Sequence, residues 1–397
     1  MGKSTLSYRR TLAACFIGYL VQAAICTFAP LLYVRFRTEF GFSLDRISAI
    51  IAVTFIVQLF VDLASSVFVE RIGHRVCLVA AHFLAAAGFV LMGVLPDVTA
   101  DPFTGLMIAV VMYSVGAGLI EVLISPTVEA CPTKRKNATM NLLHSCFAWG
   151  EVLVVLGSTL FFTLCGIDNW RLLCCLWAII PAANGALFLF VPLNVFGDGA
   201  STHKQMKKLL ASGKFWLLLV IMICAGAAEL AVSQWASALV ETGLHLDKTV
   251  GDLLGVCMFG AFMGFGRLFG TRFEDRSLHT VMLVCTVLCA VSYLMIGLVP
   301  IPAINLIGMA LCGFAVSLLW PMTLSLAAHT MPEGGMALFG LLAFGGDIGC
   351  ALGPWWAGTM AARFGDDLQI GILFSLVFPA ILLAALFFVK RKQTDRR

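Results

Sequence analysis

Charge is scarce in this sequence. Only 12% of the 397 residues are Asp, Glu, Lys or Arg, whereas 60% are hydrophobic. A soluble domain usually devotes about a quarter of its positions to charged residues. The shortage therefore excludes an ordinary soluble protein and favours one that uses lipid as its solvent. It also excludes a nucleic-acid-binding protein, because the sequence offers no folded basic surface outside the apolar runs.

Several catalytic and energy-coupling motifs are missing as well. The sequence contains no His-Glu-x-x-His zinc motif, no Gly-x-Ser-x-Gly turn and no Walker Gly-x-x-x-x-Gly-Lys loop. The string Gly345-Gly346-Asp347 lacks the Gly-x-Gly-Asp order of intramembrane aspartyl proteases. An intramembrane enzyme and an ATP-driven pump are therefore disfavoured, and the sequence implies no metal, nucleotide or covalent cofactor.

Long apolar runs dominate what is present. About twelve of them recur along the chain, each long enough to cross a hydrocarbon layer roughly 30 Å thick as a helix. The runs lack the period-two alternation of barrel strands, so they predict an all-α polytopic membrane protein. The expected spans are 11–33, 45–69, 76–95, 104–128, 140–163, 171–193, 214–240, 249–270, 278–299, 303–328, 336–360 and 370–389.

The basic residues predict an orientation. Most of the 26 Lys and Arg residues fall in loops on the side of the N-terminus, and cytoplasmic loops retain positive charge. Both termini are therefore expected in the cytoplasm, with the protein in a plasma membrane such as the inner or cell membrane of a bacterium. Arg267 lies within a span. The basic residues on the opposite face are Arg35, Arg37, Arg46, Arg171, Lys248 and Arg363.

The polar stretch 194–213 divides the predicted spans into two groups of six. It predicts an N-terminal bundle at 1–193, a cytoplasmic linker at 194–213 and a C-terminal bundle at 214–397. Each half carries a short charged turn between its second and third spans, at 70–75 and 274–276. Repeated halves are typical of secondary transporters that work by alternating access.

The charged turn of the first half resembles the signature of the major facilitator superfamily. That signature is a small residue, an acid, then Arg, Gly and basic residues, and the matching positions are Ser66, Glu70, Arg71, Gly73, His74 and Arg75. Arg267, Gly270, Asp275 and Arg276 look like a second copy. The resemblance implies that these charges latch neighbouring helices at the cytoplasmic face and influence the inward-to-outward switch. The alternative is a positively charged loop with no further role.

Acids inside spans are the most informative single residues, because a carboxylate in hydrocarbon is costly unless it is paired, protonated or hydrated. A carboxyl group in such a setting can bind and release a proton as access alternates. Glu121, Glu151 and Glu229 are the candidate proton-coupling residues. Asp62 and Asp347 are expected to make interhelical or gating contacts, and Asp252 is expected near the end of its span within reach of water.

The surroundings of Glu121 resemble the fucose permease branch of the superfamily. The pattern Gly-x-Gly-x-x-Glu-x-x-x-x-Pro spans 116–126, and Asn141-Leu142 is followed by Gly150, nine residues after the Asn. The resemblance implies that Glu121 is a proton- and sugar-linked carboxylate and that Asn141 is a polar position of helix five. The branch also has an acid in helix one before a Pro, whereas no acid precedes Pro30 here. Coupling has moved to another carboxylate, or the protein is a facilitator, or its substrate differs.

Glu229 is the replacement candidate, because its span begins the second half as the first span begins the first. Gln234 and Trp235 follow it, and a sugar offers hydroxyls to Glu and Gln and an apolar C–H face to Trp. The alternative is a structural hydrogen bond from Glu229 to a neighbouring helix. The predicted substrate contacts are Glu229, Gln234, Trp235, Gln22, Asn141 and His144.

These observations predict a monomeric, twelve-helix secondary transporter of the major facilitator fold that moves a sugar or polyol with protons. The first alternative is a proton-coupled exporter of drugs or lipophilic cations, in which buried acids act as counter-charges. An organic-anion carrier ranks third, because Arg267 is the basic residue within a span and lies close to its cytoplasmic end.

Overall fold

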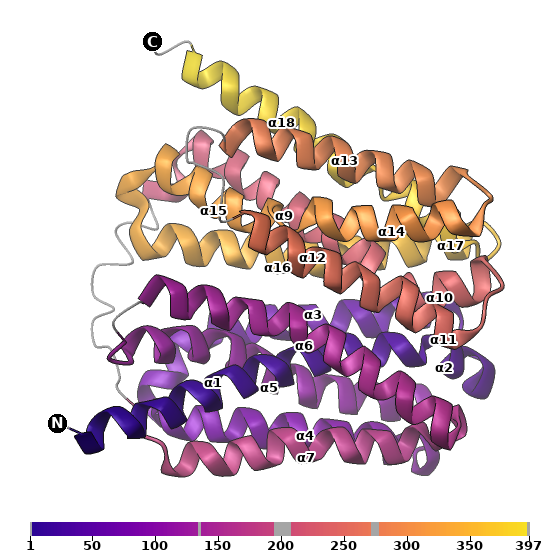
Figure 1. Ribbon diagram of the computed structural model, residues 1–397, viewed down its shortest axis with the longest axis horizontal. Helices are drawn as coiled ribbons and strands as arrows, with labels where there is room; N and C mark the ends of the chain where they lie inside the picture. Colours follow the sequence, from indigo (N-terminus) through magenta and orange to yellow (C-terminus); the bar gives the residue numbers. More distant parts are fainter. Residues whose placement is uncertain (1, 134–135, 194–207, 271–277, 395–397) are drawn as a thin grey trace. The chain divides into compact units, whose positions relative to one another are not determined.

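The computed structural model describes residues 2–133, 136–193, 208–270 and 278–394. Within these residues the secondary structure is helical and contains no strand (Figure 1). Twelve helical stretches of the described chain are long and apolar enough to cross a membrane. The prediction of an all-α polytopic membrane protein with twelve spans is therefore confirmed.

The spans, numbered here in chain order, are built from one helix each or from several short ones. The first six are α1 (Gly2–Phe28) with η1 (Ala29–Leu32) and α2 (Tyr33–Phe40), α3 (Leu44–Ile72), α4 (His74–Val98), α5 (Pro102–Ala130), α6 (Lys136–Cys165), and η2 (Ile167–Asn169) with α7 (Trp170–Phe190). The last six are α9 (Gly213–Ser233) with α10 (Ala236–Ala238) and η3 (Leu239–Gly243), α11 (Lys248–Val250) with η4 (Gly251–Cys257) and α12 (Met258–Gly270), α13 (Leu278–Leu298), α14 (Pro302–Val316) with α15 (Leu319–Thr330), α16 (Gly335–Arg363), and α17 (Leu368–Phe374) with α18 (Val377–Thr394).

The chain forms two compact units. The first comprises Met1–Phe42 and Val53–Gly197, and the second comprises Ser43–Ala52 and Asp198–Arg397. Most of the predicted linker, at 194–207, lies outside the described residues. The bundle boundaries at 193 and 214 stay a prediction.

Spans 1 and 7 are interrupted at corresponding points. In span 1 the α-helix gives way to a 3₁₀ turn at Ala29–Leu32, where Pro30 cannot donate a backbone hydrogen bond. In span 7 the helix breaks at Gln234, and a π-helical segment, η3, follows. Each interruption begins about two thirds of the way along its span, at Ala29 in Gly2–Phe40 and at Gln234 in Gly213–Gly243. Interrupted helices at equivalent places in two halves commonly mark binding sites in secondary transporters.

Small residues set the closest helix contacts within each unit. A side chain at Gly116 of α5 would overlap the backbone of Ala81 on α4, and one at Gly349 of α16 would overlap the backbone of Ile223 on α9. The helices of each pair lie side by side in Figure 1. Such glycines let backbones approach where packing, rather than expulsion of water, drives association.

Candidate functional site

Glu121 lies in a polar cluster of the first unit. The Gln22 Nε2 of α1 donates to Glu121 Oε2 of α5 at 3.2 Å and to Gln58 Oε1 of α3 at 2.9 Å. Gln58 Nε2 in turn donates to the carbonyl of Thr54 at 3.2 Å. Gln22 and Gln58 expose only 5% and 3% of their surfaces. The structure therefore brings together two predicted site residues, Gln22 and Glu121, and adds Gln58, which has no recognisable motif around it.

Local packing explains why these three side chains meet. A side chain at Gly118 would lie against the backbone of Gln58 and the side chain of Val61, so α3 and α5 approach closely at this level. Glu121 follows Gly118 by three residues and so lies on the same side of α5, one turn further on. Gly118 thus lets α3 approach closely enough for the Gln58 amide to join the cluster.

The cluster contains one unused hydrogen-bond acceptor. Gln22 Oε1 is buried and has no hydrogen-bond partner among the described residues. An unpaired buried carbonyl typically costs about 1–3 kcal/mol. Among the described residues, the hydrogen-bond donor to Glu121 is the neutral amide of Gln22, and no basic side chain pairs with its carboxylate. This environment suits both a change of protonation state and contacts with hydroxyl groups.

A second group of polar side chains lies one turn away on the same helices. Tyr19 OH and Ser125 Oγ lie 2.8 Å apart, and the Tyr19 ring packs edge-on against His144 with ring centres separated by 5.5 Å. Tyr19 precedes Gln22 by three residues and Ser125 follows Glu121 by four, so each pair shares a helix face. His144 is exposed, and Glu151 is half-buried two turns further along α6. The side chain of Asn141 lies outside the described part of the chain, so its role in substrate binding stays a prediction.

Glu229 occupies the second unit and is paired with Arg267. Glu229 Oε1 lies 3.7 Å from Nη2 of Arg267, with side-chain exposures of 12% and 23%. This distance is an ion pair but exceeds a hydrogen bond. The sequence placed Arg267 in the cytoplasmic motif, whereas its guanidinium contacts the acid of span 7.

The residues after Glu229 differ in their environments. Ser233, one turn on from Glu229, exposes 8% of its surface, and its Oγ has no hydrogen-bond partner among the described residues. Trp235 is fully buried, and its Nε1 donates to the carbonyl of Pro354 at 2.9 Å. Gln234 is buried between them, at the interruption of span 7.

The charged turn between α3 and α4 joins elements of the first unit. Gly73 has a φ of +101°, a conformation that favours glycine, and it starts α4 directly after α3. Arg75 Nη1 donates to the carbonyls of Phe188 and Leu189 at 2.7 and 2.9 Å, at the C-terminal end of α7. A cation is favourable there, because helix C-termini carry unpaired carbonyls. Arg71 is exposed; the side chain of Glu70, and Asp275 and Arg276 altogether, lie outside the description.

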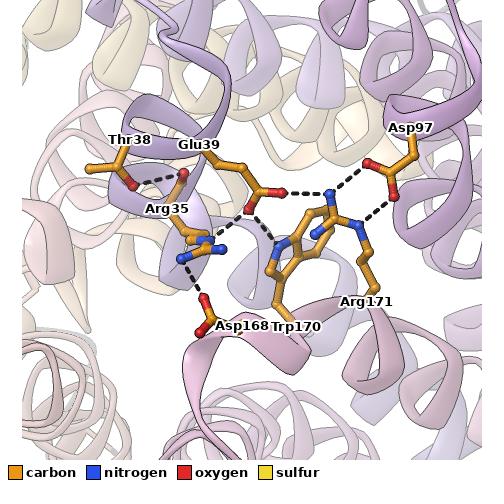
Figure 2. Close-up of polar contacts among 7 residues, drawn as sticks. All are labelled: Arg35, Thr38, Glu39, Asp97, Asp168, Trp170 and Arg171. Atoms are coloured by element: carbon orange, nitrogen blue, oxygen red, sulfur yellow. Dashed lines mark hydrogen bonds and ion pairs between the residues drawn. The ribbon is translucent and has the colours of Figure 1, made fainter.

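A charged network in the first unit was not predicted (Figure 2). Arg171 of α7 binds both oxygens of Asp97 on α4 at 2.6 Å, and its Nη2 also binds Glu39 of α2 at 2.5 Å. Glu39 Oε2 further accepts hydrogen bonds from Arg35 at 2.6 Å and from Trp170 Nε1 at 3.0 Å.

The network has two further contacts, and both strengthen the attachment of α2 to its neighbours. Arg35 Nη1 lies 2.7 Å from Asp168, and the Arg171 guanidinium lies 4.4 Å from the centre of the Trp170 ring, a cation–π distance. The network thus fixes α2, the short helix after the interruption of span 1, to α4 and α7. The spacing of Arg35 and Glu39 by four residues was the one local signal for it.

Asp252 also differs from expectation. It is fully buried, and its Oδ1 accepts from Ser237 Oγ at 2.5 Å and lies 3.0 Å from Lys248 Nζ. The prediction that water reaches Asp252 is wrong, because its side chain is buried where α10 and the π-helical segment η4 pack together. π-helical segments are frequent at functional sites.

Comparisons with known proteins agree on the fold. The family profile described as Major Facilitator Superfamily matches residues 11–354 and 248–397. A bacterial homologue of the human lysosomal transporter Spinster, inward-facing and unoccupied, is similar with a TM-score of 0.78, 14% identity and 98% of each chain covered. A D-xylose–proton symporter is similar with a TM-score of 0.74 and 15% identity over 97% of this chain and 96% of that one.

The Escherichia coli fucose:proton symporter is similar with a TM-score of 0.63 and 14% identity over 95% of this chain and 98% of that one. Identities this low establish the fold and leave the substrate open. The profile match extends over most of the chain, and the twelve spans agree with it. The resemblance inferred from the charged turn is confirmed: this chain belongs to the Major Facilitator Superfamily, a family of membrane transporters.

Proposed function

We propose that the protein is a secondary active symporter that moves a sugar or related polyol together with protons by alternating access. The cluster of Glu121 with Gln22 and Gln58 is the observation that carries this proposal. It supplies a carboxyl group that can change protonation state, next to buried amides of the kind that bind hydroxyl groups.

The contacts of Glu121 favour proton chemistry over a purely structural role. A structural buried acid is normally held by a cation or by several donors, whereas Glu121 receives one amide hydrogen bond of 3.2 Å from Gln22. The Oε1 atom of the same Gln22 has no hydrogen-bond partner among the described residues. A substrate hydroxyl that donates to Gln22 Oε1 and accepts from a protonated Glu121 would satisfy both groups at once.

Glu229 is the second proposed acid, in the other unit. Ser233 and Gln234 follow it at the interruption of span 7, and interrupted helices of this kind commonly line the substrate site of secondary transporters. We leave Trp235 out of the proposed contacts, because its ring is fully buried and its one N–H donates to Pro354.

Two structural relatives support the proposed substrate class. One is a D-xylose–proton symporter and the other a fucose:proton symporter, and each matches nearly all of this chain. The basic loops favour a plasma-membrane protein with both termini in the cytoplasm. In that orientation Arg75 would hold the cytoplasmic end of span 6 to the turn between spans 2 and 3.

The proposal is tested by uptake into proteoliposomes. A panel of labelled hexoses, fucose included, is offered with and without an imposed inward proton gradient to the native protein, to Glu121→Gln and to Glu229→Gln. We expect one sugar to accumulate only with the gradient. Accumulation should be lost in at least one of the two variants, while exchange of labelled for unlabelled sugar survives in it.

The matched control is Asp247→Asn, which removes an exposed carboxylate just before span 8. It should accumulate sugar as the native protein does. Uptake that is indifferent to the gradient would show a facilitator rather than a symporter. Failure of every sugar, together with gradient-dependent efflux of a lipophilic cation, would replace the proposal with a drug exporter.

A further inference from the structure

Arg267 lies inside a span, and most of the N–H donors of its guanidinium have no partner among the described residues. A guanidinium carries five N–H donors in a planar fork that matches a carboxylate. Among the described residues, Glu229 is its acidic partner, at 3.7 Å, too long for a hydrogen bond. By contrast, Arg171 makes three contacts of 2.5–2.6 Å with two carboxylates. The loose pair of the second unit therefore keeps a free fork.

A buried hydroxyl group, that of Ser233, lies on the same face of α9 as Glu229. Ser233 is more than nine-tenths buried, and its hydroxyl has no partner among the described residues. Residues four apart on a helix share a face, so Ser233 follows Glu229 on the side that meets Arg267. A buried hydroxyl with no partner among the described residues, one turn along α9 from the acid that meets the guanidinium, indicates a ligand that offers both a hydroxyl and an acidic group.

The geometry points to a hydroxylated monocarboxylate, the class of the sugar acids, as the transported solute, with its carboxylate bound by Arg267 and a hydroxyl bound by Ser233. This inference rests on the proposed symport and names its substrate class. The sequence alone ranked an anion carrier third, because Arg267 was expected near the end of its span, away from the acid of span 7.

Charge balance explains how the pair would couple the solute to a proton. In the empty state Glu229 and Arg267 neutralise each other. A proton that binds Glu229 alone leaves Arg267 uncompensated, and an anion that binds Arg267 alone leaves two negative groups beside one cation. When both bind, the carboxyl is neutral and the anion pairs with Arg267, so the site is neutral again. Proton and anion therefore bind cooperatively, since each intermediate state holds an unpaired charge in a poorly hydrated place.

One cation also limits the charge of the solute. A phosphate monoester is doubly charged near neutral pH and would leave one excess negative charge at a site with a single guanidinium. A monocarboxylate leaves none, and its two oxygens match the guanidinium fork.

Arg267 is the charged group that acts on Glu229 at ion-pair distance. The other ionisable groups on helices packed against α9, or bonded to it, are Asp347, Cys350 and Arg363 on α16, His279, Cys285, Cys289 and Tyr293 on α13, Cys312 on α14, His329 on α15, and Lys390, Arg391 and Lys392 near the end of α18, whose side chains lie outside the description. Tyr293 donates its hydroxyl to the carbonyl of Ala228. Variants of Glu229 and Arg267 therefore test the pair directly.

The test measures equilibrium binding to the purified full-length protein. Three probes separate the two halves of the proposed ligand: gluconate has a carboxylate and hydroxyls, glucitol has only hydroxyls, and hexanoate has only the carboxylate. We expect gluconate to bind most tightly. Arg267→Gln should raise its Kd by about 30-fold, the loss of a charge-assisted pair of hydrogen bonds, and Arg267→Lys should raise it less.

Proton release or uptake during binding supplies a readout that a structural ion pair would not change. Binding of gluconate to the native protein should take up about one proton through Glu229, measured by calorimetry in buffers of different ionisation enthalpy. In Glu229→Gln, which resembles the protonated acid, that uptake should disappear while gluconate still binds. Arg363→Gln, an exposed arginine at the far end of α16, is the control and should leave both readings unchanged.

The outcomes separate this inference from the symport on which it rests. Tight glucitol or hexose binding that Arg267→Gln leaves unaltered would overturn the acidic substrate and keep the sugar symporter. Gluconate binding without proton uptake would overturn the coupling by Glu229. If none of the probes binds and no hexose is accumulated by the proteoliposomes, both proposals fail together.

Discussion

The charged network of the first unit and the ion pair of the second unit use the same residue types in opposite ways. In the first, Asp97 and Glu39 hold Arg171 through three contacts of 2.5–2.6 Å, and its guanidinium packs on Trp170. In the second, Arg267 and Glu229 stand 3.7 Å apart. Closely bonded pairs hold helices together, whereas a loose pair keeps hydrogen-bond donors that a ligand can use. Contact geometry therefore separates structural from functional charges more clearly than charge content does.

The amide cluster of the first unit is a third case. Glu121 accepts its hydrogen bond from the neutral amide of Gln22, which also bonds Gln58, so among the described residues no cation compensates the unit change of charge when Glu121 is protonated. At Glu229 the same proton would free Arg267. The two acids are therefore expected to respond differently to the same substitutions.

A pair of arginine variants should show the largest difference in stability between the two units. Arg171→Gln should lower the free energy of unfolding by about 2 kcal/mol, because the largely enclosed Glu39 loses its close partner, whereas the half-exposed Asp97 adds little. Arg267→Gln should cost about 1 kcal/mol or less, since Glu229 can take up a proton instead. Thermal unfolding in detergent compares them. Equal losses of unfolding free energy in the two variants would contradict the distinction between a closely bonded and a loose pair.

Removing both charges of each pair sharpens the comparison. Glu229→Gln with Arg267→Gln should leave stability unchanged or raise it by about 1 kcal/mol, because two desolvated charges disappear together. Glu39→Gln with Arg171→Gln should remain about 1–2 kcal/mol less stable than the native protein, since Arg35 and Asp97 keep their charges without these partners. Full recovery in the second double variant would show that the network of Figure 2 is dispensable.

The amide cluster should respond more mildly. Gln58→Leu removes the acceptor of Gln22 and should cost about 1 kcal/mol in the free energy of unfolding. Gln22→Leu removes an unpaired acceptor together with the donor to Glu121, so its cost should be similar or smaller. Solute accumulation should fall in Gln22→Leu far more than stability does. A loss of stability that accounts for all the lost accumulation would assign Gln22 a packing role.

The smallest expected effect is that of Trp235→Phe. The substitution removes one buried hydrogen bond to Pro354 and should cost about 0.5–1 kcal/mol. Solute affinity should not change, because the ring is fully buried. A several-fold rise in Kd with unchanged stability would return Trp235 to the substrate contacts.

Hydropathy was sufficient to predict the helices, because a span needs about twenty apolar residues and little else. Glu121 was found for the same reason, as a costly acid with a recognisable glycine pattern. Gln58 was missed, since a single amide on an apolar helix has no signature. The partnership of Arg267 with Glu229 was missed too, because sequence position gives depth along one helix but not how two helices meet.

The network around Arg171 shows a further limit. Its members come from four elements, and apart from Arg35 and Glu39 their sequence separations carry no periodic signal. Asp252 lies in the π-helical segment η4 and bonds to Ser237 of α10, so its burial belongs to an irregular segment whose contacts the sequence does not signal. Local irregularity therefore set the limit of prediction at the places where polar groups gather.

Proton movement tests the account most directly. Lightly buffered proteoliposomes that contain the native protein are given gluconate, or the hexose that they accumulate, while a pH electrode follows the outer medium. The account predicts a prompt rise of the external pH that a protonophore abolishes and that is lost in Glu229→Gln. Solute entry with no change of external pH would contradict proton-coupled symport.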